Sequence, residues 1–232
     1  MTGSDANEKI GGLLALDRLI DFDGVDAAQK TTRFASYLRS ALRSNDNAVL
    51  IFAARSLGRL AKPGGALTAE LVESEIQSAL EWLQSERQES RRFAAVLVIR
   101  ELAKGSPTLL YGFVQQIFEL IWIALRDPKV LIRETAAEAV SECFEIIAAR
   151  DHAVRRQWFA RIYEESLQGL KSSSVDWIHG SLLILKELLL KGAMFMNEHY
   201  RNACEIVLRL KDHRDPKIRT QVVLTIPILA SY

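Results

Sequence analysis

The sequence predicts an all-α protein, an α-solenoid made of about five and a half two-helix repeats. First, glycine and proline are scarce, with 12 and 5 among 232 residues, which disfavours a turn-rich β fold. Second, apolar residues recur with a period of 3.6 rather than in alternation. Third, similar segments return about every 41 residues, which is the signature of a repeat array.

The apolar period predicts eleven helices and no strand. In order, they cover residues 5–20, 30–42, 47–61, 68–83, 89–103, 109–126, 129–148, 153–170, 175–190, 196–211 and 217–231. The connections are short, the longest being 21–29 and 62–67, so no linker divides the chain. We therefore expect residues 1–232 to be a single solenoid segment without separate domains.

Polar residues and prolines mark where these helices begin. Asp46, Thr68, Ser106, Asp127 and Asp215 have the side chains preferred at helix N-caps, and a proline follows each of the last three. These starts support the order of helices given above.

The repeat shows in a basic residue that is followed by small or apolar residues three and seven positions later. Arg92, Arg133 and Arg219 begin this pattern fully, and Lys9 and His179 begin it less completely. Arg133 follows Arg92 by 41 residues, and Arg219 follows His179 by 40. Two helices in 40 to 47 residues are typical of HEAT or armadillo repeats. We expect Arg133 and Arg219 each to point toward the loop that carries Asp127 or Asp215, or toward an acid of a neighbouring repeat. Each should bond helix-end carbonyls or carboxylates rather than solvent.

Small residues in the inner helices of such repeats, Gly11 and Gly12 among them, are expected to permit close helix approach. The two ends of the chain lack the polar outer face of a terminal repeat. Residues 217–231 are apolar on nearly every side, and 5–20 resembles an inner helix without a partner before it. We therefore expect a segment of a longer array, with Leu224 and Ile228 exposed as a docking surface for the next repeat.

Composition excludes several other classes of function. A net charge of +1 provides no field for collecting nucleic acid. Cys143 and Cys204 are isolated, which excludes a disulfide framework or a zinc site and fits an intracellular, reducing compartment. The longest apolar stretch, 109–125, contains two glutamines and a glutamate, so we expect a buried helix rather than a membrane span.

Catalytic patterns are not found in the sequence. The four histidines do not share helical spacing with another metal ligand, and residues 62–65 lack the strand and terminal Lys-Ser/Thr of a phosphate loop. We expect no catalytic, cofactor-binding or metal-binding residue, and hence no enzymatic activity in this segment. A basic run allows two interpretations, a solvated helix end or an anion or partner patch. It comprises Arg150, His152, Arg155, Arg156 and Arg161, with Trp158 among them.

Longer strings carry a family resemblance. They are residues 4–8 (SDANE) with Gly11 and Gly12, 79–83 (ALEWL), 91–103 (RRFAAVLVIRELA), 127–129 (DPK), 132–134 (IRE) and 178–185 (IHGSLLIL). In their order and spacing they resemble the N-terminal HEAT-repeat region of the target-of-rapamycin (TOR) serine/threonine protein kinases, over essentially the whole chain. One departure is the short connection between Lys191 and Asn197. The resemblance implies that animal members of the family carry a long variable insertion at this place.

The resemblance implies a non-catalytic part of a large cytoplasmic kinase of the phosphatidylinositol-3-kinase-related group, which controls growth in response to nutrients. Its kinase domain has no counterpart in these residues, so no catalytic or cofactor residue is carried over. The implied partners are the rest of the kinase, a Raptor-type scaffold subunit and, in animals, a Rheb-type small GTPase. The alternative is a free-standing HEAT adaptor of transport or phosphatase type, and an all-α enzyme is a third hypothesis.

Overall fold

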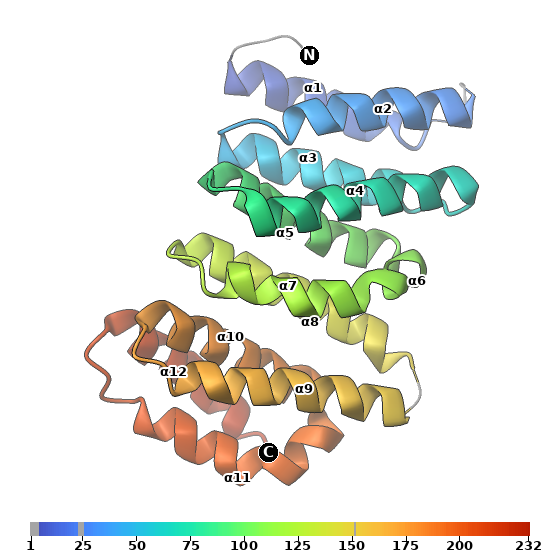
Figure 1. Cartoon of the computed structure of the whole chain (residues 1–232). Coiled ribbons are helices and arrows are strands. Elements are labelled where there is room, and N and C mark those ends of the chain that lie inside the picture. The colour runs from blue at the N-terminus through green and yellow to red at the C-terminus, as the bar shows by residue number, and fades with distance from the viewer. Residues whose placement is uncertain (1–4, 23–25, 151) are drawn as a thin grey trace. The chain divides into compact units, whose positions relative to one another are not determined.

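The computed structural model of the chain describes residues 5–22, 26–150 and 152–232, and most of them lie in helices (Figure 1). Ser4, in the first string of the family resemblance, lies outside these residues. No strand occurs in the described ranges. The all-α prediction is confirmed.

Each of the eleven predicted helices is present within the described residues. The helices are α1 (Ala6–Leu19), α2 (Ala27–Ala41), α3 (Asn47–Leu60), α4 (Ala66–Ser85), α5 (Glu89–Gly105), α6 (Pro107–Leu110), α7 (Val114–Leu125), α8 (Val130–Ala148), α9 (His152–Leu170), α10 (Val175–Lys191), α11 (Ala193–Arg209) and α12 (Pro216–Leu229). The predicted helix 109–126 is divided, because the 3₁₀ turn η1 (Tyr111–Phe113) separates α6 from α7.

Two of the predicted helix caps have the expected geometry. The Asp46 carboxylate accepts a hydrogen bond from the Val49 N–H at 3.0 Å at the start of α3. The Asp215 carboxylate accepts one from the Lys217 N–H at 2.8 Å, with proline as the first residue of α12. Both side chains satisfy donors that have no acceptor within the helix.

The other three predicted caps differ from expectation. Thr68 is not a cap, because α4 begins one turn earlier, directly after Gly64 and Gly65, whose φ angles are 78° and 90°. Positive φ is easily adopted only by glycine, so this pair starts the helix. Asp127 lies two residues before the cap of α8, and Ser106 precedes α6 without a side-chain cap bond.

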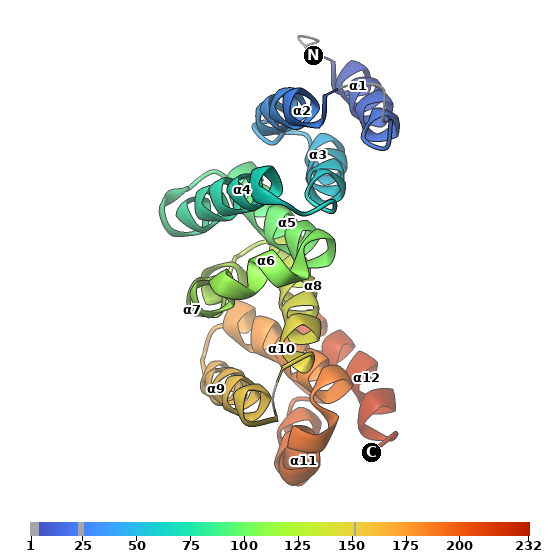
Figure 2. The same ribbon diagram turned by 90° about the vertical axis from the view of Figure 1, so that its right-hand side faces the viewer.

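The chain divides into two compact units, residues 1–124 and 125–232, each described by itself. In the first unit, α1, α3 and α5 lie side by side in one layer, and α2 and α4 pack against them as a second layer (Figure 2). In the second unit, α8, α10 and α12 form one layer, and α9 and α11 form the other (Figure 2). The prediction of a single segment 1–232 stays a prediction.

Two glycines allow α3 and α5 to approach closely. A methyl group added at Gly105 would stand 2.1 Å from the carbonyl oxygen of Gly58, and one added at Gly58 would stand 2.6 Å from the carbonyl oxygen of Glu101. Gly11, which the sequence suggested for this purpose, has open space around it. Main-chain contact between α3 and α5 therefore depends on Gly58 and Gly105.

The segment Pro107–Leu125 is long and apolar enough to cross a membrane by length and composition, with a mean hydropathy of 1.5. Many of its apolar side chains are buried inside the protein, among them Leu110, Ile117, Ile121 and Leu125. This burial accounts for the hydropathy of the segment without a membrane.

Candidate functional site

The basic residues of the repeat pattern bond the loops that precede their own helices. Each guanidinium donates to main-chain carbonyls five or six residues earlier, at the turn into the helix. The bonds are Arg92 to Arg87 O, Arg133 to Asp127 O at 2.6 Å, and Arg219 to His213 O and Arg214 O at 2.7 and 2.9 Å. The predicted role of Arg133 and Arg219 is confirmed.

Arg133 also joins one repeat to the next. Its side chain is fully buried, and the same Nη1 that bonds Asp127 donates to the Asp176 carboxylate of α10 at 2.6 Å. Its Nε donates to Nδ1 of His179, also on α10, at 3.2 Å. Burial first, and then the adjacent Arg133 charge, lower the pKa of His179 from 6.5 to about 4. His179 therefore stays neutral at pH 7, and its unprotonated Nδ1 accepts the hydrogen bond from Arg133.

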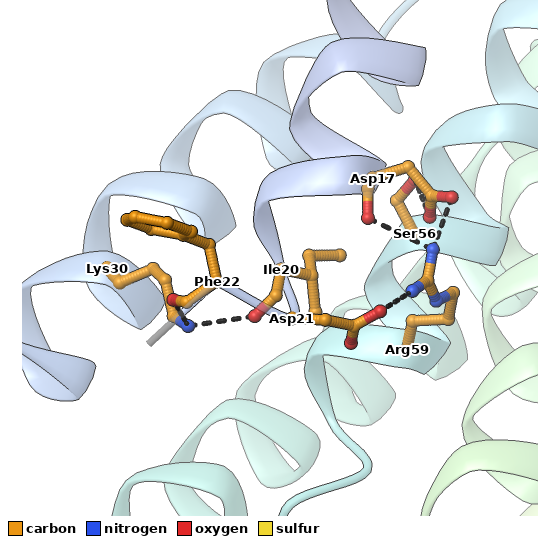
Figure 3. A network of polar contacts seen from close by, with 7 residues as sticks. All are labelled: Asp17, Ile20, Asp21, Phe22, Lys30, Ser56 and Arg59. Atoms are coloured by element: carbon orange, nitrogen blue, oxygen red, sulfur yellow. Dashed lines mark hydrogen bonds and ion pairs between the residues drawn. The ribbon is translucent and has the colours of Figure 1, made fainter. Parts of the chain in front are cut away.

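A similar polar network joins α1 to α3 in the first unit (Figure 3). Arg59 of α3 forms ion pairs with Asp17 and Asp21 and donates to the Asp17 carbonyl oxygen at 3.0 Å, while the Ser56 hydroxyl donates to the Asp17 carboxylate at 3.2 Å. Lys30 of α2 donates to two main-chain carbonyls at the end of α1, 2.8 and 2.9 Å away (Figure 3). These bonds fix the end of α1 against both neighbouring helices.

Charged pairs between helices recur at the length of one repeat. The residues that they join are 36 to 46 positions apart in the sequence. They are Arg39–Glu75 (36), Arg59–Asp17 (42), Arg126–Glu165 (39), Arg133–Asp176 (43), Lys191–Glu145 (46) and Arg156–Glu198 (42). The sequence period of about 41 residues thus reappears as contacts between adjacent repeats.

The predicted docking residues lie on α12. Val222 and Leu229 are buried, whereas Val223 and Leu224 are 63% and 58% exposed, and Ile228 is half-buried. Adjacent helical residues diverge by about 100°, so Val223 and Leu224 turn away from the face that packs on α10. Docking of another helix on this face stays a prediction.

The described residues do not bring a catalytic constellation together. Within the described ranges no group of three or more histidine, cysteine or carboxylate side chains could hold a metal ion. Cys143 is buried, and burial, followed by the nearby Glu142 charge, raises the pKa of its thiol to about 12. A thiol of this kind is a poor nucleophile because the thiolate is the reactive form.

Stacked helix pairs joined by side-chain bonds one repeat apart define a HEAT- or armadillo-like helical-repeat protein. A chain of the solved structure in which Kap95p binds RanGDP matches with a TM-score of 0.60 at 17% identity, covering 99% of this chain and 29% of that one. An engineered protein of known structure matches with a TM-score of 0.52 at 16% identity, covering 100% and 96%. These similarities concern the fold alone.

No family model matches the chain. Curated relatives do: tor1 of Schizosaccharomyces pombe is 45% identical over 98% of this chain, TOR of Arabidopsis thaliana 39% over 99%, and TOR2 of Saccharomyces cerevisiae 39% over 99%. The chain spans only 9 to 10% of the length of these relatives. The chain is homologous to one helical-repeat segment of the TOR serine/threonine-protein kinases. A match to one helical tenth of each kinase supports the prediction that the segment is not the catalytic part.

Proposed function

We propose that the chain is a non-catalytic scaffold segment of a TOR-type nutrient-signalling protein kinase, and that its helical repeats provide surfaces for assembly of the kinase complex. The observation that carries the proposal is identity of 39 to 45% along nearly the whole chain to one tenth of three such kinases. Similarity that extends over nearly the whole chain supports a role for the stacked surfaces rather than for a single pocket.

The first partner that we propose is the rest of the parent kinase, docked on the exposed face of α12. Val223, Leu224 and Ile226 are each more than 40% exposed on this helix, and Ile228 lies at their margin. A cluster of large aliphatic side chains in water is unusual for a soluble monomer, and covering it would release the water that solvates it.

We further propose that the segment serves a complex containing a Raptor-type scaffold subunit and, in animals, a Rheb-type small GTPase, in the cytoplasm or at organelle surfaces. These partners come from the family resemblance, and the segment's own residues that contact them are not assigned. The structure has no loop between Lys191 and Asn197, because Gly192 alone separates α10 from α11, which starts earlier than the sequence predicted. The role of the insertion that the resemblance implies for animal members is therefore outside this proposal.

The α12 proposal is tested by self-association. Sedimentation velocity should show the chain associating at high concentration, and replacing both Leu224 and Ile228 by glutamine, or extending the chain by its next repeat, should restore the monomer. Leu131→Gln is the matched control, because Leu131 is 44% exposed on α8 and its replacement should leave association unchanged. A chain that stays monomeric without any change would favour the free-standing adaptor instead.

The scaffold proposal is tested separately by pull-down with the regulatory subunits of the parent kinase. Deleting this segment from the full-length kinase should reduce subunit recovery while a purified kinase domain keeps its activity. Full recovery of every subunit without the segment would contradict a role in assembly.

A further inference from the structure

A pocket in the second unit lies where α9, the α10–α11 junction and the first turn of α11 meet. Its volume is about 420 Å³, within the range of roughly 300 to 1,000 Å³ that is usual for ligand sites. Its walls come from helices that are distant in the sequence. The lining residues that carry the argument are Arg155, Arg156, Phe159, Met194, Phe195 and Glu198.

The floor of the pocket is apolar. Phe159 and Phe195 are each only 6% exposed, and their ring centroids are 6.1 Å apart. Met194, at the mouth, is 70% exposed. A methionine side chain is flexible and adapts to the shape of an apolar group placed beside it. The floor therefore suits one large aliphatic or aromatic side chain.

The rim is basic, and one of its cations, Arg155, has no partner among the residues that the structure describes. The Arg156 guanidinium is held by Glu198 through two bonds of 2.9 and 2.6 Å, and Lys191 pairs with Glu145. In contrast, Nε of Arg155 is buried and lacks an acceptor, and no described carboxylate pairs with this side chain. A guanidinium whose charge no described carboxylate neutralises favours the approach of a negatively charged ligand.

The start of α11 adds to the positive potential at the pocket. Gly192 caps this helix without a side chain to accept from its first N–H groups, and Gly192, Met194 and Phe195 all line the pocket. These free N–H groups and the helix dipole favour a negative charge nearby.

We propose that this pocket binds an acidic peptide segment of a partner protein, with one large apolar side chain seated against Phe159 and Phe195 and a carboxylate on Arg155. A small anion would leave the apolar floor unused. A nucleic acid strand would need a longer row of cations, because its affinity grows with the number of phosphates neutralised. The proposal is independent of docking on α12, because none of the pocket residues lies on that helix.

Fluorescence anisotropy with the full chain tests this proposal. The probes are the labelled peptides GDELEDG, GDEFEDG and GDEWEDG, and at least one should bind with a Kd of roughly 10–100 µM. The peptide GDESEDG, which lacks the apolar side chain, and the basic peptide GKKLKKG should bind at least about fivefold more weakly.

Variants separate the pocket from general charge effects. Arg155→Gln should weaken binding at least about fivefold, the loss expected for one charged hydrogen bond. Arg201→Gln is the matched control, since Arg201 is exposed on α11 outside the pocket, and it should change the Kd less than twofold. Equal far-UV circular dichroism spectra and melting temperatures would establish that both variants fold.

NMR signals of the methionine methyl groups show where on the chain the peptide binds. The chain has three methionines, and in ¹³C-methyl-labelled protein the Met194 signal should move during titration, while that of the buried Met196 should move little. Any of four results would overturn the proposal: no acidic peptide binding below about 1 mM, equal binding of GDESEDG, an unmoved Met194 signal, or tighter binding of poly(dT) or anionic vesicles than of any peptide.

Discussion

Replacing Arg133 by methionine tests whether the basic position of the repeat joins two repeats. Methionine keeps much of the side-chain volume but removes every donor. The change would leave the Asp127 carbonyl without its bond, the Asp176 carboxylate without its cation and His179 Nδ1 without its donor. Breaking a buried ion pair by removing one partner costs about 3–5 kcal/mol. Because the Asp176 side chain is 35% exposed and regains water, we expect a loss of about 2–4 kcal/mol.

Arg219 provides the matched control, since it has the same place in the repeat pattern but is exposed on α12. Its acceptors are two loop carbonyls that water can reach, so Arg219→Met should cost less than about 1 kcal/mol. For a chain of this size, each kcal/mol corresponds to about 2–4 °C in the melting temperature. Differential scanning calorimetry and urea titration followed by circular dichroism would measure both changes. Losses within about 0.5 kcal/mol of each other would refute the assigned role of Arg133.

Three further outcomes follow from the packing. Gly105→Ala should destabilise the chain by about 2 kcal/mol or more in urea titration, because the new methyl group would meet a carbonyl oxygen 2.1 Å away. Gly11→Ala, whose methyl group has open space, should stabilise the chain by about 0.5–1 kcal/mol. A stabilising effect of Gly105→Ala would contradict the close approach of α3 and α5. The pKa of His179 falls from 6.5 to about 4 on folding, so between these pH values the unfolded chain binds a proton that the folded chain does not. The free energy of unfolding should therefore decrease by up to about 3 kcal/mol as the pH falls through this window. Melting curves in which the His179→Gln variant and the unchanged chain have the same pH dependence would count against this. In the native chain a thiol reagent should modify Cys204 and spare the buried Cys143, as measured by mass spectrometry, and equal rates would show that the core opens readily.

The sequence predicted the helices well because their signal is local. Apolar residues three and four positions apart identify a buried face without reference to the rest of the fold. The errors occurred where another local feature was stronger. At the start of α4, Gly64 and Gly65 adopt positive φ and begin the helix before Thr68, the residue with the better capping side chain.

Contacts between repeats were only partly predictable. The repeat period indicated that Arg133 and Arg219 would face their own loops, because that contact lies within six residues. The bond from Arg133 to His179 spans 46 residues, and no pattern in one sequence specifies which side chain faces it. Likewise, the close contact of Gly58 with Gly105 depends on how α3 and α5 cross, and neither glycine stands out by spacing.

The α12 face and the pocket beside Arg155 also differ in how far the sequence could predict them. The exposure of Leu224 followed from helical geometry alone, because Leu224 and the buried Val222 are separated by about 200° around the helix. The pocket beside Arg155 could be found only from the fold, because its floor combines side chains of α9 and α11. The sequence identified only its basic side, as a run for which a solvated helix end was the ordinary explanation.

The exposed face of α12 also has a main-chain feature that suits docking. Pro227 lies inside this helix and has no N–H to donate, so the carbonyl of Val223, four residues earlier, cannot receive the usual helical hydrogen bond. Val223 is 63% exposed, which places this acceptor beside the aliphatic side chains of the same face. In a repeat array, stability depends on each repeat and on its contacts with neighbours. A helix that covers Leu224 would therefore bury apolar area, and a polar side chain on that helix would be able to donate to the Val223 carbonyl. Docking on α12 and stabilisation of α12 would then be one event.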